Sequence, residues 1–256
     1  MMDGMFSLEG HIAFVTGSSR GLGFEMARSL AAAGARVVLN GRDAAALERA
    51  ADQLRAEGRA VETAAADVAD EAAATRTLDA VVARHGRLDV LIANAGVQYR
   101  HPLPEFPTDE WRHLLDTHLT SAFVLARSAA GPMLRQGRGR IIVTASVMGS
   151  RVARPTIPAY AAAKAGLVGL TKALAVELGP GGVTCNAIAP GYFATEMNTA
   201  LVEDPEFSAW VEKRTPVGRW GRVEEIGGAA LFLASDAASY VNGHVLFVDG
   251  GLTAAL

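Results

Sequence analysis

The 256-residue sequence has a single cysteine, Cys185, which excludes an internal disulfide and a zinc site built on several thiolates. It has no basic excess, since 24 Lys and Arg stand against 27 Asp and Glu, and this argues against a general nucleic-acid or anionic-membrane binder. No apolar run reaches the roughly 18 residues of a spanning helix. The first ten residues lack a signal-peptide pattern, and the histidines lack metal-ligand spacing. These absences predict a cytoplasmic protein with no metal, nucleic acid or membrane partner.

Short apolar segments alternate with longer helical ones along the whole chain. This alternation predicts βαβ units, and therefore a parallel sheet with helices on both faces. Because no linker interrupts the pattern, we expect residues 1–256 to form a single doubly wound (Rossmann) α/β domain with seven strands. The expected strands cover residues 12–16, 37–40, 61–65, 90–93, 141–145, 184–189 and 245–248. The expected helices cover residues 23–33, 44–57, 71–84, 109–135, 158–178 and 224–233.

A glycine-rich turn links the first expected strand to the first helix. Its glycines are Gly17, Gly21 and Gly23. Glycines let the backbone approach a ligand closely, and a helix N-terminus attracts phosphate, so the turn predicts a pyrophosphate site. The spacing differs from the common Gly-x-Gly-x-x-Gly fingerprint. No Lys-Ser/Thr pair follows, which disfavours a nucleoside-triphosphate loop. The alternative is a turn that serves only tight packing.

A tyrosine and a lysine lie one helical turn apart in the expected helix over residues 158–178. Tyr160 and Lys164 therefore share a helix face. A nearby ammonium group favours phenolate, so we expect Lys164 to lower the pKa of Tyr160 and make the phenol a general acid or base. Ser146 follows a buried strand, at the edge of a parallel sheet where ligands bind. The alternative is that the pair merely lies on a helix surface.

Five motifs occur in the order typical of short-chain dehydrogenases/reductases, and the chain resembles that family over almost its whole length. They are TGSSRGLG (residues 16–23), ANAG (93–96), Ser146, YAAAK (160–164) and Pro190-Gly191. The resemblance implies that Tyr160 exchanges a proton with the substrate, that Ser146 orients the substrate oxygen, and that hydride passes to or from a nicotinamide. It implies a cofactor site made by Gly17, Ser19, Arg20, Gly21, Leu22, Gly23, Asn40, Arg42, Asp67, Val68, Asn94, Ala95, Gly96, Tyr160, Lys164, Pro190, Gly191 and Thr195.

One position departs from the family. Where relatives carry an asparagine that positions a water in a proton relay, this chain has His118. Histidine can donate and accept protons and titrates near pH 6.5, so we expect His118 to serve catalysis with an altered pH dependence. The alternative is a histidine packed inside a helix.

The end of the second expected strand indicates the cofactor. NAD-preferring folds place an acid there for the ribose 2′-hydroxyl, but this chain has Gly41. Arg42 follows it, and Arg20 lies in the glycine turn. Two guanidinium groups suit a 2′-phosphate, so the sequence predicts NADP. The alternative is that Arg42 is a solvated turn residue.

The segments that vary within the family indicate the substrate. Arg100, Arg151 and Arg154 form a cationic rim suited to a carboxylate. FSLEG, QYRHPLPEFP and the region after residue 188 resemble gluconate 5-dehydrogenases, which implies interconversion of D-gluconate and 5-keto-D-gluconate. We assign Arg100 to the substrate carboxylate, against the alternative of a surface ion pair. Other readings are a 3-oxoacyl-[acyl-carrier-protein] reductase and a non-catalytic NADP-sensing regulator.

Two further expectations concern assembly and closure. Residues 198–222 carry Phe207, Trp210, Val211 and Arg214 at helical spacing, which predicts one or two short helices folded over the substrate as a lid. The family resemblance implies a homotetramer that packs through the helices over residues 109–135 and 158–178.

Overall fold

The seven expected strands pair into one sheet in the computed structural model, which describes residues 2–255. All pairs are parallel and the order is β3-β2-β1-β4-β5-β6-β7, which confirms the doubly wound α/β prediction. Met1 and Leu256, the ends of the expected domain, lie outside the described residues. The strands are β1 (Ile12–Thr16), β2 (Arg36–Gly41), β3 (Val61–Ala65), β4 (Val90–Ala93), β5 (Gly139–Thr144), β6 (Val183–Pro190) and β7 (Val245–Val248).

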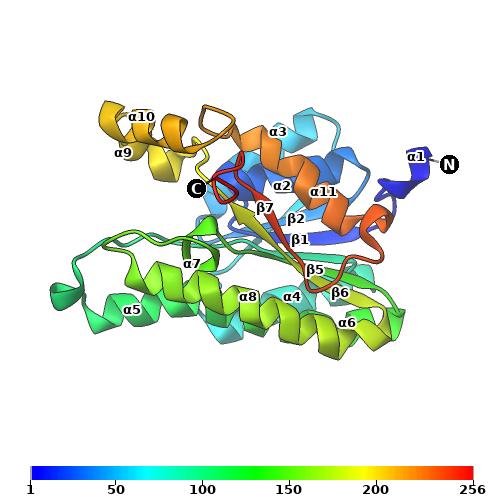
Figure 1. The fold of residues 1–256 in the computed structure, drawn as a ribbon. Helices are drawn as coiled ribbons and strands as arrows, with labels where there is room; N and C mark the ends of the chain where they lie inside the picture. Colours follow the sequence, from blue (N-terminus) through cyan, green and yellow to red (C-terminus); the bar gives the residue numbers. More distant parts are fainter. Residues whose placement is uncertain (1, 256) are drawn as a thin grey trace.

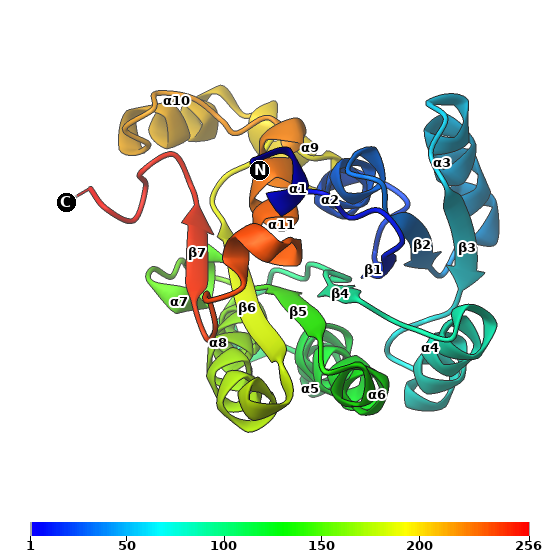
Figure 2. The same cartoon turned by 90° about the vertical axis from the view of Figure 1, so that its right-hand side faces the viewer.

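Alternate residues of β1 enter two separate hydrophobic cores, as the period of a strand requires. Ala13 and Val15 enter one core, and Ile12 and Phe14 enter the other. Figures 1 and 2 show the two helix layers on opposite faces of the sheet. The first layer is α2 (Gly21–Ala32), α3 (Ala44–Ala56) and α11 (Gly227–Ala234). The second is α4 (Glu71–His85), α5 (Thr108–Leu115), α6 (Ser121–Gln136) and α8 (Pro158–Leu178).

The strand order reverses between β1 and β4, so the loops that leave these two strands diverge to opposite faces. Ligands of open parallel sheets bind at such a point, beyond the carboxyl ends of the strands. The same edge carries the short helices α7 (Val147–Ser150), α9 (Thr199–Val202) and α10 (Pro205–Arg214), as Figure 1 shows.

The helices that start at this carboxyl edge of the sheet differ in how they are capped. Asp43 caps α3 by accepting from Ala46 N at 3.0 Å, and Asp70 caps α4 by accepting from Ala73 N at 2.9 Å. In contrast, α2 begins after Arg20 with no side-chain cap. Its first N–H groups therefore face the cleft without a side-chain acceptor, as an anion site requires.

The helix expected over residues 109–135 is present as a continuous helical run over residues 108–136, but it is not α-helical throughout. A π-helical turn, η2 (Asp116–Thr120), separates α5 from α6. Apolar spacing cannot reveal one inserted residue in a helix, and such turns often occur at functional sites. This turn carries His118 into the interior, where the residue is 4% exposed.

The remaining differences are small. The helix expected over residues 224–233 is a 3₁₀ turn, η5 (Val223–Ile226), followed by α11. The lid segment holds two short helices, α9 and α10, as predicted. Short elements that were not expected are α1 (Met2–Met5), η1 (Leu103–Glu105), η3 (Gly179–Gly181), η4 (Glu196–Asn198) and η6 (Asp236–Ala238).

The helix over residues 158–181 is long and apolar enough to span a membrane on length and composition alone. It is not an uninterrupted apolar run, because it contains Lys164, Lys172 and Glu177, so the expectation that no apolar run reaches about 18 residues is not contradicted. In the fold, α8 packs along the sheet through Leu167, Ala175 and Leu178. It also carries the buried Lys164. We read α8 as a core helix.

A buried carboxylate fastens β1 to β4 at the sheet edge opposite the cleft. Asp89 is 1% exposed; it accepts from Ile12 N at 2.9 Å and from Arg87 at 2.6 and 2.8 Å. We expect Asp89→Ala to lower the free energy of unfolding by about 2–4 kcal/mol, because it leaves buried donors unpaired. Urea unfolding measures this. Asp109→Ala, which removes a carboxylate that is 94% exposed, is the control, and an equal effect of both changes would contradict the account.

Candidate active site

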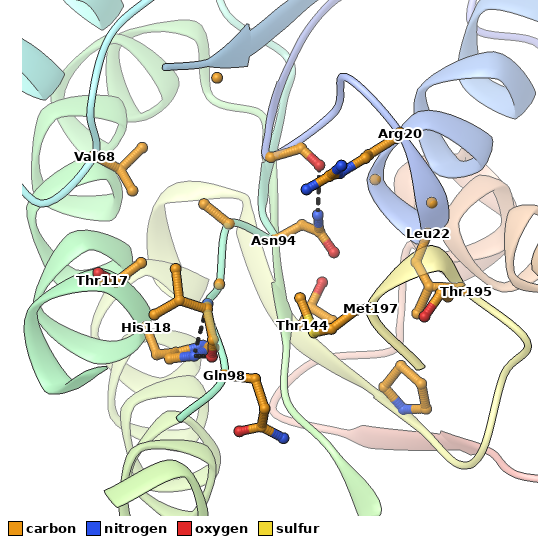
Figure 3. Close-up of a pocket in the computed structure, with 18 of the residues that line it drawn as sticks. Arg20, Leu22, Val68, Asn94, Gln98, Thr117, His118, Thr144, Thr195 and Met197 are labelled. Atoms are coloured by element: carbon orange, nitrogen blue, oxygen red, sulfur yellow. Dashed lines mark hydrogen bonds between the residues drawn. The ribbon is translucent and has the colours of Figure 1, made fainter. Parts of the chain in front are cut away.

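A cavity of about 420 Å³ opens at the carboxyl edge of the sheet. It is lined by residues from the loops after β1 to β6, and these include every predicted cofactor-binding and catalytic residue. Arg100, which was predicted to bind the substrate, is not among them. Figure 3 shows Thr117 and His118 on one side of it, facing Leu22, Thr195 and Met197 across Asn94. The topology thus gathers residues that lie more than 170 positions apart in the sequence.

The glycine turn is locked against the loop after β4. Asn94 donates from Nδ2 to the carbonyls of Thr16 and Gly17 at 3.1 Å, and Thr16 Oγ1 accepts from Asn94 N and Ala95 N. A Cβ at Gly17, where φ is +61°, would lie 2.8 Å from Ala95 Cα. A Cβ at Gly23 would overlap the Gly17 carbonyl and the Asn94 amide. Both glycines are therefore required for the two loops to meet and leave the start of α2 open.

The far end of the cavity holds the two arginines predicted for a 2′-phosphate. Arg20 and Arg42 are mostly exposed, and each faces an acid: Arg20 lies 3.1 Å from Glu196, and Arg42 lies 3.8 Å from Asp67. Gly41 at the end of β2 leaves this end without the acid typical of NAD sites. Asn40 lines the cavity, but its Nδ2 donates to Ala64 O at 2.9 Å, so this amide group also links β2 to β3.

Ser146, Tyr160 and Lys164 come together at the centre of the cavity. Ser146 starts α7 and accepts from Met148 N at 3.1 Å. Tyr160 and Lys164 project from the first turns of α8, with Lys164 Nζ 5.5 Å from the centroid of the Tyr160 ring. Lys164 donates to the carbonyl of Thr144 at 2.5 Å. The end of β5 and the start of α8 therefore position the three side chains jointly.

Burial is the largest influence on the pKa values of Lys164 and Tyr160. It lowers the pKa of Lys164 to about 7, since a dry environment disfavours the ammonium form. Burial also raises the pKa of Tyr160, opposed by a hydrogen bond with Ser146 and by the charge of Arg100. The expectation that Lys164 lowers the pKa of this phenol is therefore wrong for this arrangement, because the ammonium group is directed to Thr144 and desolvation dominates.

His118 lies edge-to-ring against Tyr160, with 5.3 Å between the ring centroids. Its Nε2 lies 2.7 Å from Val97 O, to which it donates in the neutral form, and among the described residues its buried Nδ1 has no partner. Burial, and next the charge of Lys164, lower the pKa of His118 to about 3. Titration near pH 6.5 is therefore a wrong expectation, and the imidazole is neutral at physiological pH.

A positively charged rim adjoins the catalytic group. Arg100 lies in a neighbouring hollow together with Arg20 and Arg42. Burial and the charge of Arg154 lower the pKa of Arg100, while Tyr192 and Tyr160 oppose this. Arg100, Arg154 and the two tyrosines are thus electrostatic neighbours. Arg151, the other predicted rim cation, lies instead over the ring of Phe247 at 5.3 Å.

The segment after β6 forms one wall of the cavity. Pro190, Gly191 and Thr195 line it as predicted. The two ends of the lid segment are joined by backbone hydrogen bonds, because Ala194 N donates to Gly221 O and Gly221 N donates to Tyr192 O, both at 2.9 Å. Tyr192 at one of these ends clusters with three aromatic rings of the segment between them, Phe207, Trp210 and Trp220, with centroids of the contacting rings 5.5–6.2 Å apart.

Sequence reasoning missed several lining residues. Thr117, Thr144 and Gln98 each place a buried oxygen without a hydrogen-bond partner among the described residues, so they offer polar atoms to a ligand or water. Thr144 ends β5, two positions before Ser146, and its place at a strand end was the available signal. No comparable signal marks the others, which include Phe193, Glu196, Met197 and Asn198.

Comparison with known proteins places this geometry in a family. A family model described as enoyl-(acyl carrier protein) reductase matches residues 17–253. A gluconate 5-dehydrogenase of Gluconobacter oxydans is 48% identical over 98% of both chains. A 5-keto-D-gluconate 5-reductase of Escherichia coli is 41% identical over the full length of both. The crystal structure of a gluconate 5-dehydrogenase from Burkholderia cenocepacia, in complex with NADP and tartrate, is 46% identical over all of both chains with a TM-score of 0.96. The chain belongs to the short-chain dehydrogenase/reductase family.

Proposed function

We propose that the protein is an NADP-dependent oxidoreductase that interconverts D-gluconate and 5-keto-D-gluconate. The observation that carries the proposal is the Tyr160 phenol, which shares one cavity with the Ser146 hydroxyl and feels the charge of Arg100 from the adjoining hollow. A phenol and a hydroxyl suit a substrate alcohol or carbonyl, and a guanidinium group suits a carboxylate. The names of the Gluconobacter and Escherichia relatives support this substrate.

The cofactor proposed is NADP, and the residues of the cleft fit it. The glycine turn would hold the pyrophosphate at the uncapped start of α2. Arg20 and Arg42 would bind the 2′-phosphate, and Gly41 leaves the end of β2 without the acid that would repel it. Asp67 and Val68 would hold the adenine, with Asn94–Gly96, Pro190-Gly191 and Thr195 toward the nicotinamide. When bound, NADP supplies the carbon that accepts or returns hydride. The NADP in the Burkholderia structure supports this choice.

The chain's own residues would handle the proton and the substrate. Ser146 orients the reacting oxygen, and Tyr160 takes the proton from the alcohol or gives it to the carbonyl. Lys164, with a pKa lowered to about 7, is present in both charge states near neutrality and keeps a positive charge available near the phenol. The neutral His118 offers Nδ1 as a buried acceptor for a water or hydroxyl. Arg100 binds the carboxylate.

The two alternatives have less support. A 3-oxoacyl-[acyl-carrier-protein] reductase acts on an apolar acyl chain, which gives no role to the charged Arg100–Arg154 rim. A non-catalytic NADP sensor gives no role to a tyrosine, a serine and a lysine gathered at one point. The description of the matching family model concerns a shared fold and does not identify a substrate.

The assembly and setting are part of the proposal. Residues 1–256 would act as one dinucleotide-binding domain with residues 198–222 as the substrate lid. A homotetramer is supported by the outer faces of the second helix layer, where Val176 on α8 is 79% exposed and Phe123 on α6 is 44% exposed. A reducing, cytoplasmic compartment is consistent with the free, buried Cys185.

The central test is turnover of D-gluconate with NADP, followed by NADPH absorbance. We expect Tyr160→Phe to lower kcat at least about a thousandfold and to leave NADPH binding within about threefold, because only the proton-exchanging hydroxyl is removed. Tyr240→Phe, on a side chain that is fully exposed, is the control. Full activity of Tyr160→Phe, or preferred turnover of acetoacetyl thioesters by the wild type, would overturn the proposal.

The cofactor preference depends on Arg42. We expect Arg42→Asp to raise KM for NADP at least about tenfold and to lower KM for NAD, because a carboxylate repels the 2′-phosphate and accepts from a 2′-hydroxyl. The measurement is initial rate against each cofactor. Arg49→Asp makes the same charge change on an exposed position of α3 outside the cavity. Equal KM values for both cofactors in the wild type would show that the preference does not exist.

Lys164 should destabilise the fold in a pH-dependent way. Its folded pKa of about 7 lies below the value of 10.5 for a free lysine, so the unfolded state binds more protons between these pH values. Stability of the wild type should therefore rise from pH 7 to about 10. We expect the free energy of unfolding of Lys164→Met to exceed that of the wild type by roughly 2–4 kcal/mol at pH 6. This difference in stability should become smaller toward pH 10.

Urea unfolding at pH 6, 8 and 10 checks this expectation. Lys172→Met, which changes an exposed lysine on the same helix, should shift stability by less than about 0.5 kcal/mol at each pH. A gap for Lys164→Met that stays constant with pH would show that the buried lysine is not the titrating group.

A further inference from the structure

The loops that carry Arg100 and Arg154 are fastened to each other. His101 N, directly after Arg100, donates to Thr156 O at 2.9 Å. Thr156 has a φ of +71°, a conformation that non-glycine residues adopt at a cost of about 1–3 kcal/mol. The strained turn thus holds the second loop against the first. The guanidinium group of Arg154 is thus kept near that of Arg100, which lines the hollow beside the cavity.

This pair of cations lacks an anion. Among residues 2–255, neither Arg100 nor Arg154 forms an ion pair with a carboxylate. The Tyr192 hydroxyl beside them is buried. The charge of Arg154, a hydrogen bond with the same side chain and the charge of Arg100 all oppose the rise in the pKa of Tyr192 that its burial causes. Two guanidinium groups and one phenol hydroxyl therefore converge on a place suited to a carboxylate.

Arg154 also touches the lid. Its guanidinium carbon lies 4.7 Å from the centroid of the Phe207 ring on α10. The same ring packs edge-on against Tyr192, with 5.6 Å between centroids. Figure 1 shows α10 at the same end of the molecule as the start of α8, which carries Tyr160. One side chain therefore joins the carboxylate-binding rim to the lid.

We propose that Arg154 is the second arm of the carboxylate clamp, and that its contact with Phe207 couples carboxylate binding to closure of the lid. This inference rests on the proposed function and adds to it a specificity residue and a positioning contact. A substrate carboxylate that holds Arg154 between Arg100 and Tyr192 fixes the cation over Phe207, and so favours the closed lid. A substrate without the carboxylate leaves the two cations to repel each other.

The first experiment measures D-gluconate kinetics at saturating NADP. We expect Arg154→Ala to raise KM at least tenfold while kcat changes less than threefold, and Arg154→Lys to have a smaller effect on KM because it keeps the charge. The control is Arg151→Ala, which removes a cation from the same loop whose ring contact is with Phe247. An unchanged KM for Arg154→Ala, or a loss confined to kcat, would overturn the clamp.

The second experiment measures binding without turnover. In a Tyr160→Phe background with NADP bound, the fluorescence of Trp210 and Trp220 in the lid follows a D-gluconate titration. We expect Phe207→Leu to raise the half-saturating concentration at least threefold, and the Arg154→Ala/Phe207→Leu pair to bind no more weakly than Arg154→Ala alone. Independent, multiplying effects would overturn the coupling to the lid.

The two experiments separate this inference from the function on which it rests. Wild-type enzyme that does not turn over D-gluconate, with binding that still depends on Arg154, overturns the proposed reaction and supports the clamp. Turnover without dependence on Arg154 supports the reaction and overturns the clamp. Absence of both binding and turnover overturns both.

Discussion

A buried ammonium group that is held by a backbone carbonyl governs the site. Lys164 is 4% exposed and donates to Thr144 O at 2.5 Å, and no described carboxylate pairs with it. Its pKa therefore falls to about 7. The same dry surroundings raise the pKa of Tyr160 and lower that of His118 to about 3, so both rings are neutral at physiological pH. Lys164 is thus the group of this cluster whose charge changes near neutrality.

Most of the fold was predictable because buried parallel strands are short apolar runs between helices. The limits of β1, β3, β4 and β7 agree with the structure at both ends. What failed depends on single residues. The π-helical turn at Asp116–Thr120 inserts one residue without disturbing the apolar period, so the sequence could not distinguish it from the α-helix on either side.

Most residues that line the site could be predicted from the sequence, but the pKa values of its titratable groups could not. The glycine turn, Ser146, Tyr160 and Lys164 do line one cavity, since strand ends of a parallel sheet converge. The pKa values were predicted in the wrong direction for Tyr160 and too high for His118, because a sequence contains no measure of desolvation. Thr117 carried no signal of its own, and Gln98 was noted only as part of the substrate-indicating segment QYRHPLPEFP. The pairing of Arg20 with Glu196 joins positions 176 apart, which only the fold reveals.

The joined ends of the segment after β6 affect how freely that segment can change in length. Tyr192–Ala194 and Gly221 hold each other through backbone hydrogen bonds, so the segment that leaves the end of β6 returns to the same place before the chain continues into η5 and α11. A change in the length of the segment between these ends therefore costs little conformational entropy, because its two ends stay joined. The part nearest Gly221 is less free to change, since Val217 N donates to Gly250 O near the C-terminal end of the described chain.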